Sequence, residues 1–391
     1  MAIDVCIRGA GVVGKALALL LARARIRVGL VQTPQPSGAH ADIRAFALNA
    51  ASQSLLSSLR AWPEYTCAVQ HIWVQGDGAG ASAGVVQFDA AAMGVDALAW
   101  IVDASALEQR LHTAVSFAPE ISLLSAPEPA ALTVICEGRS SASREAAGLA
   151  YEQVAYEQTA IAATLQVELP HQATARQWMQ GGEVCALLPR SSQSEPNATG
   201  GNSVALVWSV QHEHAQQLLA MDEAQFCAAL QHACGNALGA MRLTSLRAAW
   251  PLHLAQASRW VGTGLGAGMD AQNGLHGGAW ALAGDAAHAV HPLAGQGLNL
   301  GLGDAAELAQ VLAGKEYFRS YGDLRLLRRY ERARKGDAAA LRVATDGLQR
   351  LFANEDERAR SLRNWGMRGF EALAPLKSAV MRRAMGISRS V

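Results

Sequence analysis

The chain lacks the signatures of several protein classes. No uncharged apolar run reaches the ~18 residues that a membrane-spanning helix needs. No basic leader precedes an apolar core at the N-terminus, so we expect no secretory signal peptide. The six cysteines form no Cys-x-x-Cys pair and no disulfide pattern, which is typical of small buried residues in a reducing compartment. These absences favour a cytoplasmic protein whose membrane contact would be peripheral.

Signals for three kinds of site are missing as well. There is no Gly-x-Ser-x-Gly sequence for a hydrolase nucleophile. Asp285, His288 and His291 have spacing that could suit a metal, but no further Cys/His cluster supports one, so we predict none. The net charge is zero and no nucleic-acid motif accompanies the basic residues, which argues against a nucleic-acid partner. With 391 residues, half of them hydrophobic, the chain can bury a large core or two.

A glycine motif stands at the start of the chain. The strand-like run Ile3 to Ile7 leads directly into Gly9-Ala10-Gly11-Val12-Val13-Gly14, and a helical, Ala/Leu-rich segment follows. In a dinucleotide-binding turn the first glycine permits the tight turn, the second lets a pyrophosphate approach, and the third lets helix and strand pack. Residues 26–31 read as the second strand, but Gln32 stands where an acid would bind a ribose hydroxyl. A glycine-rich turn of another α/β domain is the alternative.

The most informative stretch is Gly284 to Gly303, which reads GDAAHAVHPLAGQGLNLGLG. Asp285 follows the buried strand-like run Trp280 to Ala283, and Gly295-Gln296-Gly297 opens an apolar helical segment ending near Leu312. Glycines at a helix start let backbone N–H groups approach a ligand, and the helix dipole favours negative charge there. This segment therefore predicts a second anion-binding loop.

Together the two motifs resemble the FAD-dependent aromatic hydroxylases, and most closely the ubiquinone-biosynthesis hydroxylases. The resemblance runs over nearly the whole chain. It includes the DxRxxAL segment at Asp42 to Leu48, an altered ADGxxSxxR motif at Cys136 to Arg144, and the intact GDAAHxxHPxAGQGLNLG block. It implies an α/β fold in which a Rossmann-like FAD-binding domain of the glutathione-reductase type is interleaved with a mixed-sheet substrate domain, plus C-terminal helices.

We expect a discontinuous arrangement of domains. Residues 1–68, 98–165 and 261–315 would form the FAD-binding domain, with Arg44 on a helix. Residues 69–97 and 166–260 would form the substrate domain, and residues 316–391 a C-terminal helical region.

The resemblance also assigns the cofactor. Arg44 and Asp285 would contact FAD, with Asp285 at the ribityl or pyrophosphate region. Pro292 and the segment from Gly295 to Asn299 would line the flavin ring. The full set of expected FAD contacts is Gly9, Gly11, Val12, Val13, Gly14, Gln32, Arg44, Asp285, Pro292, Gly295, Gln296, Gly297, Leu298 and Asn299. Gln32, Glu137 and Ala104 depart from the family pattern, and the first two weaken single hydrogen bonds by ~1 kcal/mol each.

The reaction that the resemblance implies is aromatic hydroxylation. NAD(P)H, bound transiently because no second Rossmann motif is present, reduces FAD, and one atom of O₂ is transferred to a phenol ring. An apolar pocket would exclude water. Candidate walls are Trp178, Leu187, Trp208, Trp250 and Leu252, although aromatic and leucine residues in strands are more often core. We identify no catalytic base, and His291 is a candidate for assisting deprotonation of the phenol.

The substrate that the resemblance implies is a polyprenylated phenol of ubiquinone synthesis. From Glu316 onward there are 17 Lys or Arg against 9 Asp or Glu, whereas the first 315 residues hold 16 against 24. This basic region is either a solvated helix face or a contact for the inner face of the membrane or for a quinone-biosynthesis complex. Hydroxylation of a small soluble aromatic, a non-catalytic FAD-fold subunit and a flavin reductase are the alternatives.

Overall fold

A six-stranded sheet carries the N-terminal glycine motif. The computed structural model describes residues 3–32, 42–77, 83–191, 200–264, 278–289, 296–353 and 357–386. The central strand β1 (Val5–Arg8) pairs in parallel with β2 (Val28–Val31) and β9 (Leu132–Ile135). Outside them lie β8 (Ile121–Leu124), β17 (Ala279–Leu282) and the antiparallel edge strand β16 (Val261–Thr263). The inner strands are buried along their length because helices cover the sheet, as their continuous apolar runs predict.

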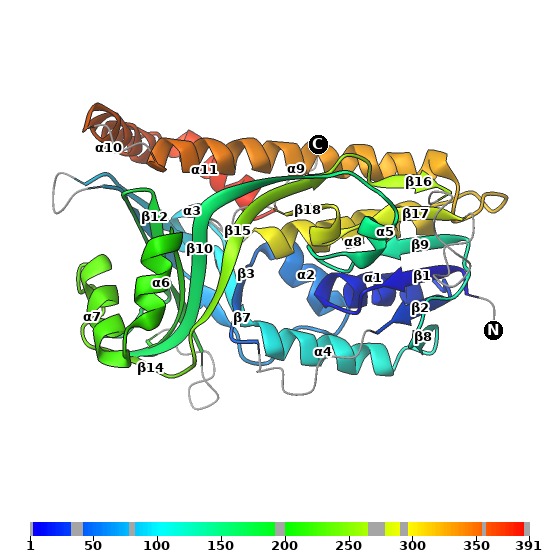
Figure 1. Cartoon of the computed structure of the whole chain (residues 1–391), viewed down its shortest axis with the longest axis horizontal. Helices are drawn as coiled ribbons and strands as arrows, with labels where there is room; N and C mark the ends of the chain where they lie inside the picture. The colour runs from blue at the N-terminus through cyan, green and yellow to red at the C-terminus, as the bar shows by residue number, and fades with distance from the viewer. Residues whose placement is uncertain are drawn as a thin grey trace.

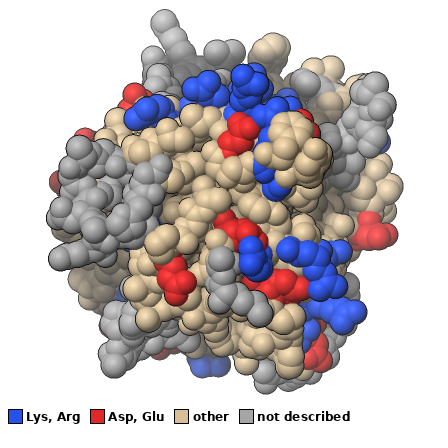
Figure 2. Space-filling model, turned by 90° about the vertical axis from the view of Figure 1, so that its right-hand side faces the viewer, with Lys and Arg blue, Asp and Glu red and all other residues tan. Residues whose placement is uncertain are grey.

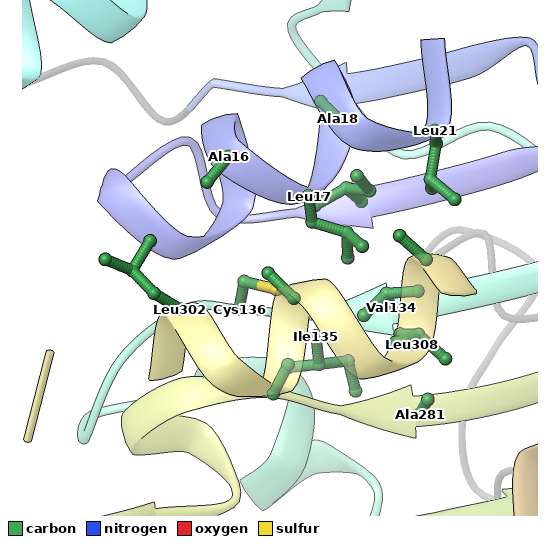
Figure 3. Packing of buried hydrophobic residues seen from close by; sticks show 14 of the residues in the cluster. Ala16, Leu17, Ala18, Leu21, Val134, Ile135, Cys136, Ala281, Leu302 and Leu308 are labelled. Carbon is green, nitrogen blue, oxygen red and sulfur yellow. The ribbon is translucent and has the colours of Figure 1, made fainter. Parts of the chain in front are cut away.

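Two glycine-started helices pack side by side on this sheet. Helix α1 (Val12–Arg23) follows the first glycine motif and α8 (Gly297–Ala313) the second. In Figure 3, Leu17 of α1, Leu308 of α8 and Val134 of β9 meet in one core. The helices can approach closely because a Cβ at Gly301 would lie 2.8 Å from Val13 Cγ2. Residue 301 of α8 must therefore be glycine for α1 and α8 to pack this closely. Helix α4 (Ala104–Ser116) packs against α1.

A second, nine-stranded sheet stands beside the first one (Figure 1). Its order is β18-β15-β10-β13-β12-β11-β5-β6, with β14 paired to β10. Helices α6 (His212–Ala220) and α7 (Glu223–Ala233) cover one of its faces. The strands are β5 (His71–Gln75), β6 (Val85–Asp89), β10 (Tyr151–Val167), β11 (Thr174–Gln180), β12 (Glu183–Arg190), β13 (Ser203–Gln211), β14 (Met241–Leu243), β15 (Ala248–Ala257) and β18 (His288–Ala289).

Short elements connect the sheets. Strands β3 (Ala45–Leu48), β4 (Cys67–Val69) and β7 (Ala99–Asp103) form a three-stranded antiparallel sheet. The helices α2 (Ala50–Ser58), α3 (Ala90–Met93), α5 (Ala142–Ala146) and the 3₁₀ turn η3 (Gly284–Ala286) complete this part. The expectation that a helix carries Arg44 is wrong: the residue directly precedes β3 and lies outside any helix. The helix α2 begins only after Asn49, whose side chain accepts a hydrogen bond from Ser52 N.

The expected domain boundary at residue 165 falls inside a strand. β10 is 17 residues long, and residues 151–165 pair with β15 and β13 of the nine-stranded sheet. In Figure 1 the strands β10 and β15 run from the first layer into the second as one pair. The other limits of the division remain predictions. The α/β class, the second mixed sheet and the C-terminal helices are confirmed.

Three helices end the chain: α9 (Leu324–Ala353), α10 (Glu357–Ala372) and α11 (Ala374–Ala384). Helix α9 crosses the molecule from the six-stranded sheet toward α10 (Figure 1). Its 30 residues span ~45 Å, so the arginines of its first turns lie far from α10.

At the end where α9 begins, Lys and Arg side chains gather in two groups, with Asp and Glu among them (Figure 2). No helix within the described ranges is long and apolar enough to cross a bilayer.

Candidate functional site

A cavity of about 700 Å³ lies between the two sheets. One side of it is made by both glycine loops and by the turn after β9. The other side is the face of the nine-stranded sheet that α6 and α7 do not cover. The lining therefore combines the carboxyl ends of parallel strands, where α/β folds bind ligands, with an apolar sheet face.

The N-terminal loop has room for a ligand. Gly9, Gly11, Val12 and Val13 line the cavity, and Gly9 adopts φ +105°, as the tight turn requires. Gly11 is the N-cap of α1, and a Cβ added to it would meet nothing within 4 Å. The packing of the protein itself therefore does not require glycine at residue 11. A pyrophosphate bound at the N-terminus of α1 would require it, because a side chain there would block its approach to the backbone. This observation fits a dinucleotide such as FAD.

The second loop lies next to the first. The side chain of Val13 packs against Gly284 and Gly301, and Gly284, Asp285, Gly297 and Leu298 line the cavity. The two glycine motifs, far apart in the sequence, therefore lie side by side at Val13, Gly284 and Gly301. Pro292, Gly295 and the candidate base His291 lie outside the described residues.

Charged groups border the cofactor side of the cavity. The Arg44 guanidinium is 2.6 Å from the Asp42 carboxylate, and this hydrogen bond holds the pKa of Arg44 above its ordinary value. Burial raises the pKa of Asp285, although the positive charges of His288, Arg139 and Arg44 oppose that shift. Both Arg44 and Asp285 face the cavity, in positions open to a polar ligand.

A buried arginine joins the two cofactor-side turns. Arg144 is 2% exposed and donates to the Arg139 carbonyl at 2.6 Å and to the Ala286 carbonyl at 3.3 Å. Its guanidinium lies 3.5 Å from the Tyr151 ring centroid, and the Tyr151 hydroxyl donates to the Asp285 carbonyl at 2.7 Å. This arrangement fixes the turn after β9 relative to η3. Within the altered motif at residues 136–144, Arg144 thus positions the turn after β9 against η3.

The Glu137 carboxylate forms its hydrogen bonds within the same turn. It accepts hydrogen bonds from Ser141 Oγ at 2.8 Å, from Ser143 N at 2.9 Å and from Ser143 Oγ. Burial disfavours its charge, but the bonds from Ser143 and Ser141 and the charge of Arg8 outweigh burial and lower the pKa of Glu137. The longer side chain therefore keeps an ionised carboxylate at this position. Ala104 is buried and donates its N–H to the Arg44 carbonyl.

Several predicted cofactor contacts lie just outside the cavity lining. The third glycine, Gly14, packs against Gly9, and Gln32 follows β2 and donates its N–H to the Leu124 carbonyl at 2.9 Å. The Asn299 side chain donates to the Ala47 carbonyl and accepts from Asn49 N, while Gln296 is the N-cap of α8. Asn299 therefore positions the start of α8 against β3, and direct FAD contact for these residues remains a prediction.

The sheet side of the cavity is nearly uncharged. Its apolar lining residues occupy alternate positions of each strand, as a pleated sheet requires. Trp250 and Leu252 belong to it, as predicted. The apolar set is Ala162, Val184, Ala186, Leu188, Val207, Trp250 and Leu252.

Three predicted pocket walls are wrong. Trp178, Leu187 and Trp208 are 3%, 1% and 3% exposed and pack in the core beneath α6 and α7, where Phe226 also lies. Each occupies the opposite strand parity from its cavity-lining neighbours, such as Ala186 and Val207. Size and hydrophobicity cannot distinguish the two faces of a strand that is buried on both.

Polar residues that the sequence did not single out also line the cavity. Lys15 is buried, with Nζ 3.8 Å from Glu108 Oε2, and both border the cofactor side with Arg139. Gln177, Ser209 and His253 lie on the sheet side. Gln177 and Ser209 follow the strand alternation of the cavity face, whereas His253 is adjacent to the lining residue Leu252, so alternation alone would not have found it.

His288 stabilises the fold and does not belong to the cavity lining. Its Nε2 is 2.6 Å from Asp304 Oδ2, and its ring stacks on Trp260 at 4.8 Å. Asp304 is fully buried and also accepts from Arg334 Nε at 2.8 Å and from Gly284 N at 2.9 Å. This network ties α9 and α8 to the Gly284–Asp285 turn.

Comparison with known proteins identifies relatives over the whole length. The FAD binding domain family matches residues 129–344, more than half of the chain. Ubiquinone hydroxylase UbiL of Rhodospirillum rubrum is 31% identical, with 98% of this chain and 89% of that protein aligned. The 3-demethoxyubiquinol 3-hydroxylase of Escherichia coli is 29% identical, with 98% of each protein aligned.

Solved structures share the fold. PqsL of Pseudomonas aeruginosa, a probable FAD-dependent monooxygenase, superposes with a TM-score of 0.71 at 20% identity, covering 94% of this chain and all of that one. HpxO of Klebsiella pneumoniae, in complex with FAD and uric acid, gives 0.70 at 15% identity, covering 99% and 97%. At these identities the similarity concerns the architecture alone.

Proposed function

Because this chain belongs to the FAD-dependent aromatic hydroxylases, a family that includes the ubiquinone-biosynthesis enzymes, we propose that it hydroxylates the ring of a polyprenylated phenol during ubiquinone synthesis. NAD(P)H is the transient reductant and O₂ the source of the new oxygen. The observation that carries the proposal is a single cavity with both glycine loops on one side and an uncharged sheet face on the other.

The cofactor side would hold FAD through its backbone. The N–H groups at the start of α1, beside the open space at Gly11, suit the pyrophosphate, and those at the start of α8 suit an anionic flavin. Arg44 and Asp285 offer a cation and an acceptor toward the polar part of the cofactor. When bound, FAD supplies the hydride-accepting and oxygen-transferring chemistry. The residues of the chain bind it, orient it and exclude water.

The sheet side suits a phenol ring. Ala162, Ala186 and Val207 are small residues that face the cavity from neighbouring strands, with Ala162 beside Val207 and Val207 beside Ala186 in register. Their small side chains leave space for an aromatic ring, and they carry no group that water could bridge. Exclusion of water protects the oxygen-transfer step and strengthens electrostatic interactions with the ring hydroxyl.

The direct test is turnover of the FAD-loaded protein with a 2-polyprenylphenol in detergent. We expect NAD(P)H oxidation that depends on the phenol, and a product that carries one heavy atom when the gas is isotopically labelled oxygen. NAD(P)H oxidation without labelled product would leave a flavin reductase, and a protein that binds no FAD would leave a scaffold. A preference for a soluble phenol without a prenyl chain would support the small-aromatic alternative.

A prenylated substrate would be drawn from a membrane surface, and the ends of α10 and α11 suit such a contact. Trp365, Leu373 and Val380 are 69%, 54% and 48% exposed. Among the residues of these helices whose exposure is described, Arg368, Arg382 and Arg383 are exposed cations. Exposed apolar residues beside cations are typical of a surface that lies on anionic lipid. We therefore propose a cytoplasmic protein that binds the inner membrane face peripherally through this surface.

Other apolar residues of α10 and α11 anchor these helices to the body of the protein. Met381 and Met385 are buried against Ala90 and Leu98, and the Phe370 ring lies 6.4 Å from that of Phe88. The proposed lipid contact is therefore narrower than the whole basic region, and the arginines that begin α9 lie outside it.

Cosedimentation with vesicles tests this surface. Replacing Trp365, Leu373 and Val380 by serine should lower binding to anionic vesicles at least ~tenfold, because each partly exposed apolar side chain contributes on the order of 1 kcal/mol when it enters the interface. The matched control replaces three exposed residues elsewhere, Phe117, Tyr317 and Phe318, by serine. Equal binding by wild type and both variants would remove the proposal.

A further inference from the structure

Three polar side chains lie among the apolar residues on the sheet side of the cavity. They are Gln177 on β11, Ser209 on β13 and His253 on β15. Of these three groups, only an imidazole can take up a proton near neutral pH. A phenol that is to receive oxygen becomes more nucleophilic when its hydroxyl loses its proton, so the place of an acceptor in this cavity decides where such a ring would bind.

His253 lines the cavity and is partly buried, and its contacts differ from those of the buried histidines His288 and His171. His288 is bonded to Asp304, and His171 accepts from Ala173 N and contacts the Arg190 carbonyl. The Nδ1 atom of His253, in contrast, is enclosed and has no hydrogen-bond partner within the part of the chain that the structure describes. Buried polar atoms are almost always paired, so the unpaired Nδ1 leaves the His253 ring without the protein hydrogen bonds that hold His288 and His171, and this ring belongs to the cavity lining.

The strand pairing places His253 between the cofactor side and the sheet side. β18 follows the Gly284–Asp285 turn, and its Ala289 pairs with Ala255 of β15, two residues from His253. On its other side, His253 pairs with Ala155, where β10 is irregular before the regular register resumes at Thr159. Trp250, three residues earlier, pairs with Ala160, which in turn pairs with Ser209. A substrate ring that lies on the small residues Ala162, Ala186 and Val207 would thus have His253 at the end that faces the cofactor side of the cavity.

Charged and titratable groups surround this position on several elements. Arg139 lies in the turn after β9 and donates to the Pro251 carbonyl at 3.5 Å, and Asp285 lies in η3. His288 of β18 is bonded to Asp304, while Tyr156 and Glu157 lie in the irregular part of β10. Arg139 and Asp285 border the same cavity and differ in the sign of the charge that each can carry.

We propose that His253 is the base that takes the proton of the substrate phenol. The proposal rests on the proposed function. In the step, the O–H bond of the phenol breaks, its electron pair stays on the oxygen, and the proton binds a ring nitrogen of the neutral imidazole. With FAD bound, its oxygen-transferring chemistry would act on this electron-rich phenolate ring. The imidazolium returns its proton to the hydroxylated product or to solvent after transfer.

The test compares His253→Gln with wild type across a pH series. Glutamine keeps a hydrogen-bonding group but cannot accept the proton. At pH 7 we expect kcat/KM for the phenol to fall ~10²–10⁴-fold, the usual contribution of general base catalysis. As pH rises toward ~10, where a phenol ionises without help, the loss should shrink to less than ~tenfold. His232→Gln, on the exposed end of α7, is the matched control and should keep the wild-type profile.

A second measurement does not depend on turnover. A nitrophenol absorbs in the visible range only as the phenolate, so its spectrum reports its ionisation when bound to the FAD-loaded protein. Wild type should bind more of it as phenolate than solution at the same pH contains, and His253→Gln should abolish that difference.

The outcomes separate the two ideas. If wild type hydroxylates no phenol, the proposed function fails and this inference falls with it. If wild type hydroxylates and His253→Gln loses the same fraction of kcat/KM at every pH, with the nitrophenol spectrum unchanged, only the role of His253 is overturned.

Discussion

One carboxylate holds together the turn, the helix and the tail that border the cofactor side. Asp304 is fully buried in α8, and it accepts hydrogen bonds from Gly284 N, His288 Nε2 and Arg334 Nε at 2.9, 2.6 and 2.8 Å. Arg334 has a second carboxylate partner, Asp337, at 2.6 Å, whose side chain is 61% exposed. The chain thus contains two acids on one arginine that differ mainly in burial.

Replacing each acid by asparagine gives a prediction with an internal control. Asp304→Asn keeps the shape but leaves buried cationic groups without a counter-charge and turns an amide donor toward other donors. Breaking a buried pair from one side costs ~3–5 kcal/mol. Asp337→Asn should cost ~0.2–1 kcal/mol, because water screens an exposed ion pair. Asp304→Asn should also weaken FAD binding, because a single acceptor oxygen remains for Gly284 N, His288 Nε2 and Arg334 Nε, so the Gly284–Asp285 turn is held less firmly.

Urea unfolding of the FAD-free protein and a FAD titration measure both effects. Burial raises the pKa of Asp304, but the charge and hydrogen bond of His288 and those of Arg334 outweigh burial and lower it overall. A lowered folded-state pKa means that this stabilisation is present above the unfolded value of ~3.9 and is lost as pH falls below it. The difference between wild type and Asp304→Asn should therefore hold from pH 7 to ~5 and shrink below ~4. Equal destabilisation by the two variants would refute the reasoning.

Two further pairs of variants test the glycine loop and the strand parity. Gly14→Ala places a Cβ 1.9 Å from the Gly9 carbonyl oxygen and should destabilise the FAD-free protein strongly. Gly11→Ala places its Cβ in open space, so it should change the stability of the FAD-free protein by no more than ~0.5 kcal/mol but weaken FAD binding. Thermal unfolding and a FAD titration measure the two effects. Leu187→Ala should cost ~2–5 kcal/mol of unfolding free energy in urea. Ala186→Leu, on the cavity face, should leave stability within ~1 kcal/mol and raise KM for the phenol ~tenfold or more; the opposite pattern would mean that the cavity lies on the other face.

The sequence alone predicted the glycine loops, the order of the main elements and the family. Strand, glycine turn and helix follow one another within a few residues at Gly9, and local spacing dictates such geometry. At the second motif a glycine turn follows β17, and a glycine starts α8. The helix over residues 297–313 was predicted to within a residue or two, because its apolar pattern is strong.

The domain boundary at residue 165 was less predictable. A 17-residue strand that serves two layers has no composition change where it passes from one to the other.

Only the tertiary structure decided which face of each strand meets the ligand. Leu187 and Ala186 are neighbours in one apolar run, yet one lies in the core under α6 and α7 and the other in the cavity. A strand buried on both faces has no polar alternation, so its parity is set by the pairing register with distant strands and by where the helices dock. The partners of Asp304, and the lack of one at His253, follow from the same cause: contacts between segments far apart in the chain have no local signal in the sequence.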